Sequence, residues 1–175
     1  MRRFIGNGVV KLMQRATPEG TDEKTDAECL CTFREYYLAH MRDMTVPYDG
    51  VIDLIKALRK KGVKTAVVSN KFHQAVNELC IDYFPDLIDE AIGVSDEKER
   101  KPSPVNVFKA LERLSVSKDE CLYIGDSEVD VLTAHNSGLK CIGVTWGFRR
   151  REELEAAGAE IIADSCDDIL GCFID

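Results

Sequence analysis

From residue 51 onward, helix-like and strand-like stretches alternate along the chain, and this alternation limits the possible fold more than any other feature. The first amphipathic helical stretch, 51–61, is followed by Gly62, a residue type that commonly ends helices. The predicted strands cover 63–69, 88–94, 121–125, 140–145 and 160–163. The other predicted helices cover 71–84, 104–114, 128–137, 150–157 and 166–172. Strands separated by helices predict an α/β fold, with a mostly parallel sheet covered on both faces.

Residues before 51 show a different pattern, because they read as helical throughout. Apolar residues follow a rough helical period from Phe4 to Met13, and 17–20 interrupts the pattern. A second helix is predicted over 22–42, and 45–50 reads as a connector. We therefore expect two parts, a helical domain over 1–46 and an α/β core over 47–175.

Charge and hydropathy exclude several classes of partner. The net charge of -8 argues against binding to nucleic acid or to an anionic membrane surface, since both are polyanions. No apolar run approaches the ~20 residues that cross a bilayer. The N-terminus also lacks the apolar centre and the small-residue cleavage site of a signal peptide. The sequence therefore predicts a cytoplasmic protein.

The seven cysteines favour reduced thiols over a disulfide framework, because their number is odd and they are spread through predicted strands and helices. Cys29 and Cys31 form the one tight pair. A zinc site would need a second pair or nearby histidines, and the three histidines are scattered. We therefore do not expect zinc.

Polar residues stand just after two of the predicted strands, where ligands of parallel α/β sheets bind. Ser69 and Asn70 end one strand with a hydroxyl and a turn that can donate hydrogen bonds to phosphate oxygens. Lys101 follows the next strand and can neutralise a bound phosphate. Each has a structural alternative: Ser69 or Asn70 can cap the following helix, and Lys101 can be an ordinary surface lysine.

Two carboxylates, Asp126 and Asp130, lie about one helical turn apart beyond the apolar strand 121–125. Carboxylate oxygens suit Mg²⁺, so this pair is a candidate metal site. The alternative is a capping box in which Ser127 pairs with Asp130 at the start of a helix.

The order of these motifs resembles the second, third and fourth motifs of the haloacid dehalogenase superfamily. Lys101 lies 32 residues after Ser69, and Asp126 lies 25 residues after Lys101, which is similar to the spacing in compact phosphatases of that family. The stretches 143–147 and 151–154 resemble phosphoglycolate phosphatases in particular, and 3–8 resembles part of their helical cap. The resemblance implies a three-layer Rossmann-like core with a partial helical cap.

The resemblance also implies a chemistry whose first motif, Asp-x-Asp-x-Thr, precedes the cap in that family. Its first Asp attacks phosphorus to form an aspartyl-phosphate, and its second serves as general acid and base. Mg²⁺, held in part by the carboxylates at positions 126 and 130, shares the developing charge with Lys101. No Asp-x-Asp occurs in these 175 residues. We therefore expect Ser69, Asn70 and Lys101 to hold phosphate while no residue of the chain attacks it.

A missing first motif has a structural consequence, because the family places its strand between the strands ending at Ser69 and Gly125. Its absence leaves a slot of ~10 Å with unpaired backbone groups. We expect self-association or low stability, with Phe33, Tyr36, Tyr37 and Leu38 exposed on the partial cap. We interpret the chain as a truncated gene product or one with a misassigned start, rather than an evolved non-catalytic protein.

Three alternatives remain to be weighed. A non-catalytic phosphate-binding or interaction protein on the same scaffold stays open, and reading the genome upstream of Met1 would decide it. A response-regulator receiver is disfavoured because its phosphoacceptor Asp precedes the Lys-Pro pair, whereas Asp126 follows Lys101. A dinucleotide-binding reading of Gly6 and Gly8 fails because Lys11 stands where a third glycine is needed. The substrate stays open among phosphoglycolate, pyrophosphate and other small phosphorylated metabolites.

Overall fold

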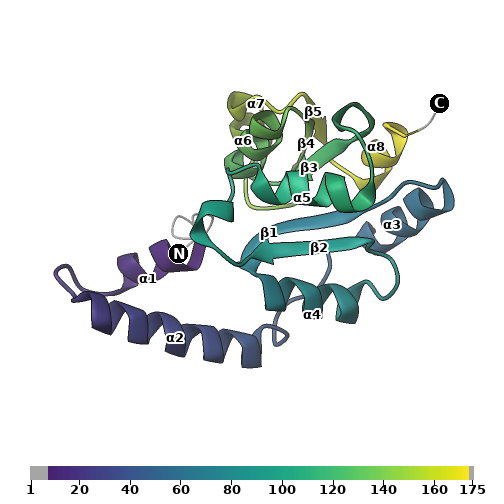
Figure 1. Cartoon of the computed structure of the whole chain (residues 1–175). Helices are drawn as coiled ribbons and strands as arrows, with labels where there is room; N and C mark the ends of the chain where they lie inside the picture. Colours follow the sequence, from purple (N-terminus) through teal and green to yellow (C-terminus); the bar gives the residue numbers. More distant parts are fainter. Residues whose placement is uncertain (1–7, 174–175) are drawn as a thin grey trace.

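The computed structural model describes residues 8–173, and helices and strands alternate from residue 51 on, as predicted (Figure 1). The strands are β1 (Ala66–Phe72), β2 (Glu90–Val94), β3 (Leu122–Gly125), β4 (Lys140–Val144) and β5 (Ile161–Ala163). The helices before β2 are α1 (Gly8–Ala16), α2 (Glu23–His40), α3 (Val51–Lys60) and α4 (His73–Tyr83). The later helices are α5 (Val105–Leu114), α6 (Glu128–Ser137), α7 (Arg151–Ala157) and α8 (Cys166–Gly171), with short 3₁₀ turns at Glu97–Glu99 and Lys118–Glu120.

The strands form two sheets rather than one. Strand β1 pairs with β2, and β3, β4 and β5 form a second sheet in that order. All three pairings are parallel, which confirms the predicted strand direction. Among the described residues, β1 and β3 therefore each have a single strand neighbour, and this separation agrees with the expected gap between them. On β3, Ile124 is 39% exposed.

Helices cover both faces of the three-stranded sheet and give the three-layer α/β/α arrangement. On one face, Cys141 packs with Val131 of α6 and Leu154 of α7, all fully buried. On the other face, Ile142 packs with Leu58 of α3 and Ile169 of α8. Because neighbouring residues of a strand point to opposite faces, successive residues of β4 fill two separate cores.

Helix α2 is capped at its N-terminus by Asp22, whose carboxylate accepts hydrogen bonds from the backbone of Lys24 and Thr25. None of its eighteen residues is buried. Of the aromatic and aliphatic side chains expected to be exposed there, Tyr36 is 65% exposed. Phe33, Tyr37 and Leu38 are half-buried, and the last two pack against the core formed by Met41 and α4. In Figure 1, α1 and α2 lie beside one end of the β1–β2 pair.

Several predicted boundaries were wrong by one to three residues, and two of them have a clear local reason. Strand β1 starts at Ala66 instead of residue 63, because the Val63 N–H bonds back to the Leu58 carbonyl and so closes α3 through the left-handed Gly62. Helix α5 starts at Val105, so Pro104 is its cap residue and not its first helical residue. The helix predicted near the N-terminus is found over Gly8–Ala16, and its expected residues 3–7 lie outside the described part.

Within residues 8–173, no helix combines the length and the apolar character needed to cross a membrane.

Candidate functional site

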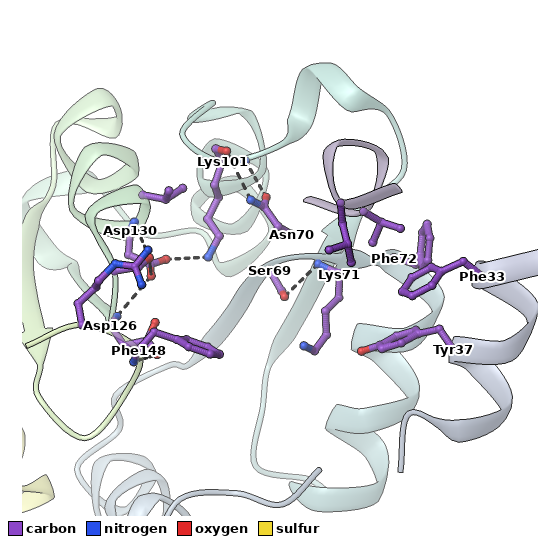
Figure 2. A pocket seen from close by; sticks show the side chains of 15 residues that line it. Phe33, Tyr37, Ser69, Asn70, Lys71, Phe72, Lys101, Asp126, Asp130 and Phe148 are labelled. Atoms are coloured by element: carbon purple, nitrogen blue, oxygen red, sulfur yellow. Dashed lines mark hydrogen bonds and ion pairs between the residues drawn. The ribbon is translucent and has the colours of Figure 1, made fainter. Parts of the chain in front are cut away.

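The five residues singled out at the strand ends all line one cavity of about 470 Å³. They are Ser69, Asn70, Lys101, Asp126 and Asp130. Figure 2 shows them on one side of this pocket, with aromatic residues of α2 and β1 on the other. The parallel strand direction accounts for this gathering, because the carboxyl ends of β1 and β3 open at the same edge.

The end of β1 fixes the backbone around Lys101. The Asn70 Oδ1 accepts a hydrogen bond of 2.8 Å from the Lys101 N–H, and the Asn70 amide donates to the Lys101 carbonyl at 3.4 Å. The Ser69 hydroxyl accepts from the Lys71 N–H at 3.2 Å. The cap position of α4 is Phe72, without a side-chain bond, so the alternative that Ser69 or Asn70 caps this helix was wrong.

Lys101 is largely buried and spans the space between the two sheets. Its ammonium donates to Asp130 Oδ1 at 2.7 Å and to the Val68 carbonyl of β1 at 3.1 Å. Only 14% of its side chain is exposed, so the surface-lysine alternative was also wrong. Burial alone would lower the pKa of Lys101, but the nearby oxygens of Tyr123 and Asp130 outweigh it and raise the pKa, so the ammonium stays charged.

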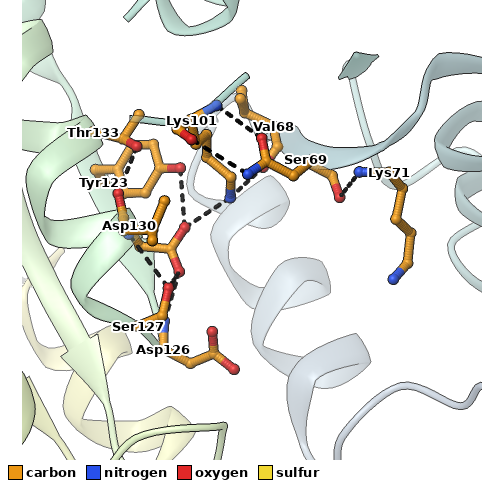
Figure 3. A network of polar contacts seen from close by, with 11 residues as sticks. Val68, Ser69, Lys71, Lys101, Tyr123, Asp126, Ser127, Asp130 and Thr133 are labelled. Carbon is orange, nitrogen blue, oxygen red and sulfur yellow. Dashed lines mark hydrogen bonds and ion pairs between the residues drawn. The ribbon is translucent and has the colours of Figure 1, made fainter. Parts of the chain in front are cut away.

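Asp130 is the centre of a buried polar network (Figure 3). Besides the bond from Lys101, the Asp130 carboxylate accepts hydrogen bonds from the Ser127 hydroxyl at 2.6 Å and from the Tyr123 hydroxyl at 3.4 Å. Burial tends to raise the pKa of Asp130, but Lys101 and the Ser127 hydrogen bond hold it below the usual value. Burial raises the pKa of Tyr123 to about 12, so its hydroxyl remains a donor at neutral pH. Ser127 also caps α6, because its hydroxyl accepts the Asp130 N–H, but the reciprocal backbone bond of the predicted capping box is not formed.

Asp126 lies nearer the opening of the pocket and is held by the segment after β4. Its Oδ2 accepts the Phe148 N–H at 3.1 Å, and its backbone carbonyl accepts the Arg149 N–H at 3.2 Å. A Cβ on Gly147 would lie 2.2 Å from the Asp126 Cβ, so this close approach requires glycine. Burial, followed by repulsion from Asp130, raises the pKa of Asp126.

The donor set fits Mg²⁺ with few protein ligands. Two carboxylates that repel each other in a partly buried pocket are stabilised by a divalent cation, and Mg²⁺ uses one or two carboxylates together with water and phosphate oxygens. Within residues 8–173, no cluster of three or more acidic, histidine or cysteine side chains could form an all-protein cage.

The lining residues that were not predicted as site residues include two cations, Lys71 and Arg149, and the neighbouring Phe148. Arg149 forms a two-pronged ion pair with Glu128, at 2.6 and 3.0 Å. The sequence holds no local signal for this pair, which joins residues 21 positions apart. Lys71 did have a signal, since it stands two residues after Ser69 on the same strand.

Comparison with known proteins identifies the class to which this pocket belongs. A profile of the family described as haloacid dehalogenase-like hydrolases matches residues 1–144. The chain therefore belongs to the haloacid dehalogenase-like hydrolase family. The observed order of motifs, the parallel sheets and the lysine–carboxylate pocket are consistent with that membership.

Among individual proteins, those that this chain is similar to include several phosphatases. The phosphoglycolate phosphatase of Pseudomonas putida strain KT2440 is 31% identical over 180 residues, which cover 98% of this chain and 65% of that protein. The pyrophosphatase PpaX of Bacillus cereus is 29% identical over 150 residues, covering 85% of this chain and 69% of that protein. A solved structure of a candidate phosphoglycolate phosphatase from Lactobacillus delbrueckii superposes with a TM-score of 0.89 at 36% identity, covering 99% of this chain and 81% of that one. The chain thus resembles phosphoglycolate phosphatases and spans about 65% of the length of the first relatives it matches.

Proposed function

We propose that this chain forms the phosphate-binding and metal-binding part of a phosphatase that acts on a small phosphate monoester. The observation that carries the proposal is the buried Lys101 ammonium, 2.7 Å from Asp130 and fixed through its backbone by Asn70. A charged, positioned lysine beside a strand-end hydroxyl is suited to hold phosphate oxygens. The phosphatases among the relatives support a phosphorylated small molecule as the substrate.

In this proposal Ser69 and Asn70 bind the phosphate group, and Lys101 neutralises its charge. Asp126, and Asp130 when Lys101 turns to the phosphate, are the residues that would hold Mg²⁺. The bound ion supplies further neutralisation of the phosphate oxygens. Arg149 keeps Glu128 neutralised beside this site, and the Phe148 N–H orients the Asp126 carboxylate.

Hydrolysis in this family is proposed to proceed through an aspartyl-phosphate. A carboxylate attacks phosphorus, the bond from phosphorus to the ester oxygen breaks, and the leaving oxygen takes a proton from a general acid. Water then cleaves the acyl phosphate. Because no Asp-x-Asp occurs in the 175 residues, we propose that this chain by itself binds phosphate without turning over an ester.

The binding half of the proposal can be tested by calorimetry of inorganic phosphate with and without Mg²⁺. The wild-type chain should bind phosphate, and Lys101→Met, which keeps the length of the side chain without its charge, should lose most of the affinity. Lys60→Ala is a matched control, because Lys60 is exposed on α3 and does not line the pocket. Circular dichroism would verify that each variant is folded. No phosphate binding by the folded wild-type chain would contradict the proposal.

The catalytic half can be tested by release of inorganic phosphate from p-nitrophenyl phosphate and phosphoglycolate. The 175-residue chain should release none above the blank. Turnover that disappears in Asp126→Asn would contradict this expectation, since it would reveal a working site with a nucleophile elsewhere in the chain. In a protein extended upstream by a segment that carries the first motif, Lys101→Ala should cost about 3 kcal/mol of transition-state stabilisation.

A second candidate function, a non-catalytic phosphate-binding or interaction protein, is favoured by the same absence of Asp-x-Asp. It predicts the same binding results but no activity in the extended protein. The activity of that extended protein therefore separates the two functions.

A further inference from the structure

Lys71 differs from the other cations that line the pocket. Lys101 is paired with Asp130, and Arg149 is paired with Glu128. Among the residues that the structure describes, no side chain or carbonyl forms a hydrogen bond or an ion pair with the Lys71 ammonium; only the backbone N–H of Lys71 is bonded, to the Ser69 hydroxyl. The pocket therefore contains one exposed positive charge that the described part of the protein does not neutralise.

Lys71 and Lys101 place their positive charges at different positions in the pocket. Lys71 follows Ser69 by two residues on β1, in the stretch between Val68 and Phe72 where the pairing with β2 is irregular, and both residues line the same pocket. Figures 2 and 3 both show the Lys71 side chain extending away from Lys101. An anion at Lys71 would thus be a second group, adjacent to a phosphate held at Ser69 and Lys101.

The surroundings of Lys71 favour a compact ligand. Beyond it the pocket is lined by rings: Tyr37 lies edge-on to Phe72 at 6.4 Å between centroids and stacks on Phe33 at 5.8 Å. Apart from the Tyr37 hydroxyl, which Figure 2 shows on the side of Lys71, these rings offer no polar group to a further charged or hydroxyl-rich portion of a ligand. A second anion close to the phosphate is therefore the group that this end of the pocket can bind.

We propose that Lys71 binds a second anionic group of the substrate, so that the site prefers small phosphate esters or anhydrides that carry a carboxylate or another phosphate. This inference rests on the proposed function, because it takes the phosphate at Ser69 and Lys101 as given. In this proposal Lys71 determines the specificity for the second anionic group of the ligand, the one that is not held at Ser69 and Lys101.

The test compares two ligands that differ in one group. Phosphoglycolate carries a carboxylate where ethyl phosphate carries a methyl group, and their dissociation constants would be measured by calorimetry at fixed Mg²⁺ and ionic strength. The wild-type chain should bind phosphoglycolate about five-fold more tightly, as expected for one solvent-exposed ion pair. Lys71→Ala should bring the ratio of the two constants close to one. Lys71→Arg should retain the preference, and Lys60→Ala should leave both constants unchanged.

Pyrophosphate, titrated without Mg²⁺, forms a separate arm that distinguishes a second phosphate from a carboxylate. If Lys71→Ala weakens pyrophosphate and not phosphoglycolate, the second group is a phosphate; the reverse identifies a carboxylate. If the folded Lys71→Ala chain keeps the wild-type preference for both ligands that carry a second anionic group, the role of Lys71 is overturned while the proposed function stands. A wild-type chain that binds none of the phosphates overturns both.

Discussion

Replacing Asp130 with asparagine should measure how much the buried pair with Lys101 contributes to stability. The substitution keeps the size of the side chain and one acceptor, but it removes the charge that faces the Lys101 ammonium at 2.7 Å. The two side chains are only 14% and 9% exposed, so the lysine would be left charged in a site with little water. Asp130→Asn therefore tests an uncompensated buried charge.

The expected magnitude follows from these distances. Two unit charges 2.7 Å apart attract by about 6 kcal/mol at an effective dielectric constant of about 20, and the cost of removing them from water offsets part of this. Removing one partner of a buried pair costs about 3–5 kcal/mol in measured cases. Because asparagine still accepts hydrogen bonds, we expect a loss of about 3 kcal/mol, or a fall of roughly 6–12 °C in the melting temperature of a chain this long.

Urea unfolding followed by far-ultraviolet circular dichroism and by fluorescence of Trp146, the single tryptophan, would measure the loss. Asp82→Asn is the control, because Asp82 pairs with Arg42 at the surface with 40% of its side chain exposed. That change should cost less than about 1 kcal/mol. If Asp130→Asn costs no more than the control, the pair is not a significant part of the folded structure and our reading of Lys101 as buried and charged is refuted.

Three further predictions concern pH, the metal site and assembly. Because the pKa of Asp130 is lowered in the folded state, its contribution should be complete above about pH 5 and be lost progressively as the pH falls below about 4, so the stabilities of wild type and Asp130→Asn should converge as the pH is lowered through that range. Gly147→Ala should displace Asp126 and weaken Mg²⁺ binding in a calorimetric titration, whereas Gly171→Ala, with no atom within 4 Å of the added Cβ, should not. The wild-type chain should self-associate in light scattering, and Ile124→Lys should reduce this by charging the open edge of β3; a monodisperse wild-type monomer would contradict the expectation.

The fold class was predictable because its signals are local. Helix α6 was predicted to the residue, since Ser127 caps its start and the left-handed Gly138 ends it, and both residue types are readable in sequence. Strand β1 was shifted because Val63 looks like a strand residue but completes the end of α3 through a hydrogen bond. The division into domains at residue 46 stays a prediction.

The sequence predicted which residues form the candidate site, but it did not predict the contacts among them. Parallel strands bring their carboxyl ends together, so Ser69, Lys101 and Asp126 could be expected in one pocket from topology alone. That Lys101 would pair with Asp130, or Arg149 with Glu128, depends on how helices pack on the sheet, and no spacing in the sequence encodes it.

The residues proposed to bind phosphate also connect the two sheets. The Lys101 ammonium bonds to the Val68 carbonyl on β1 and to Asp130 at the start of α6, while Asn70 holds its backbone. A phosphate that attracts Lys101 would weaken its hold on Asp130, and a cation at Asp126 and Asp130 would replace the positive charge lost there. Phosphate and metal should therefore bind more tightly together than separately, because each removes the charge imbalance that the other creates. The same reciprocity means that phosphate alone stabilises the folded chain less than its contacts suggest, since part of its binding energy is used to break the Lys101–Asp130 pair.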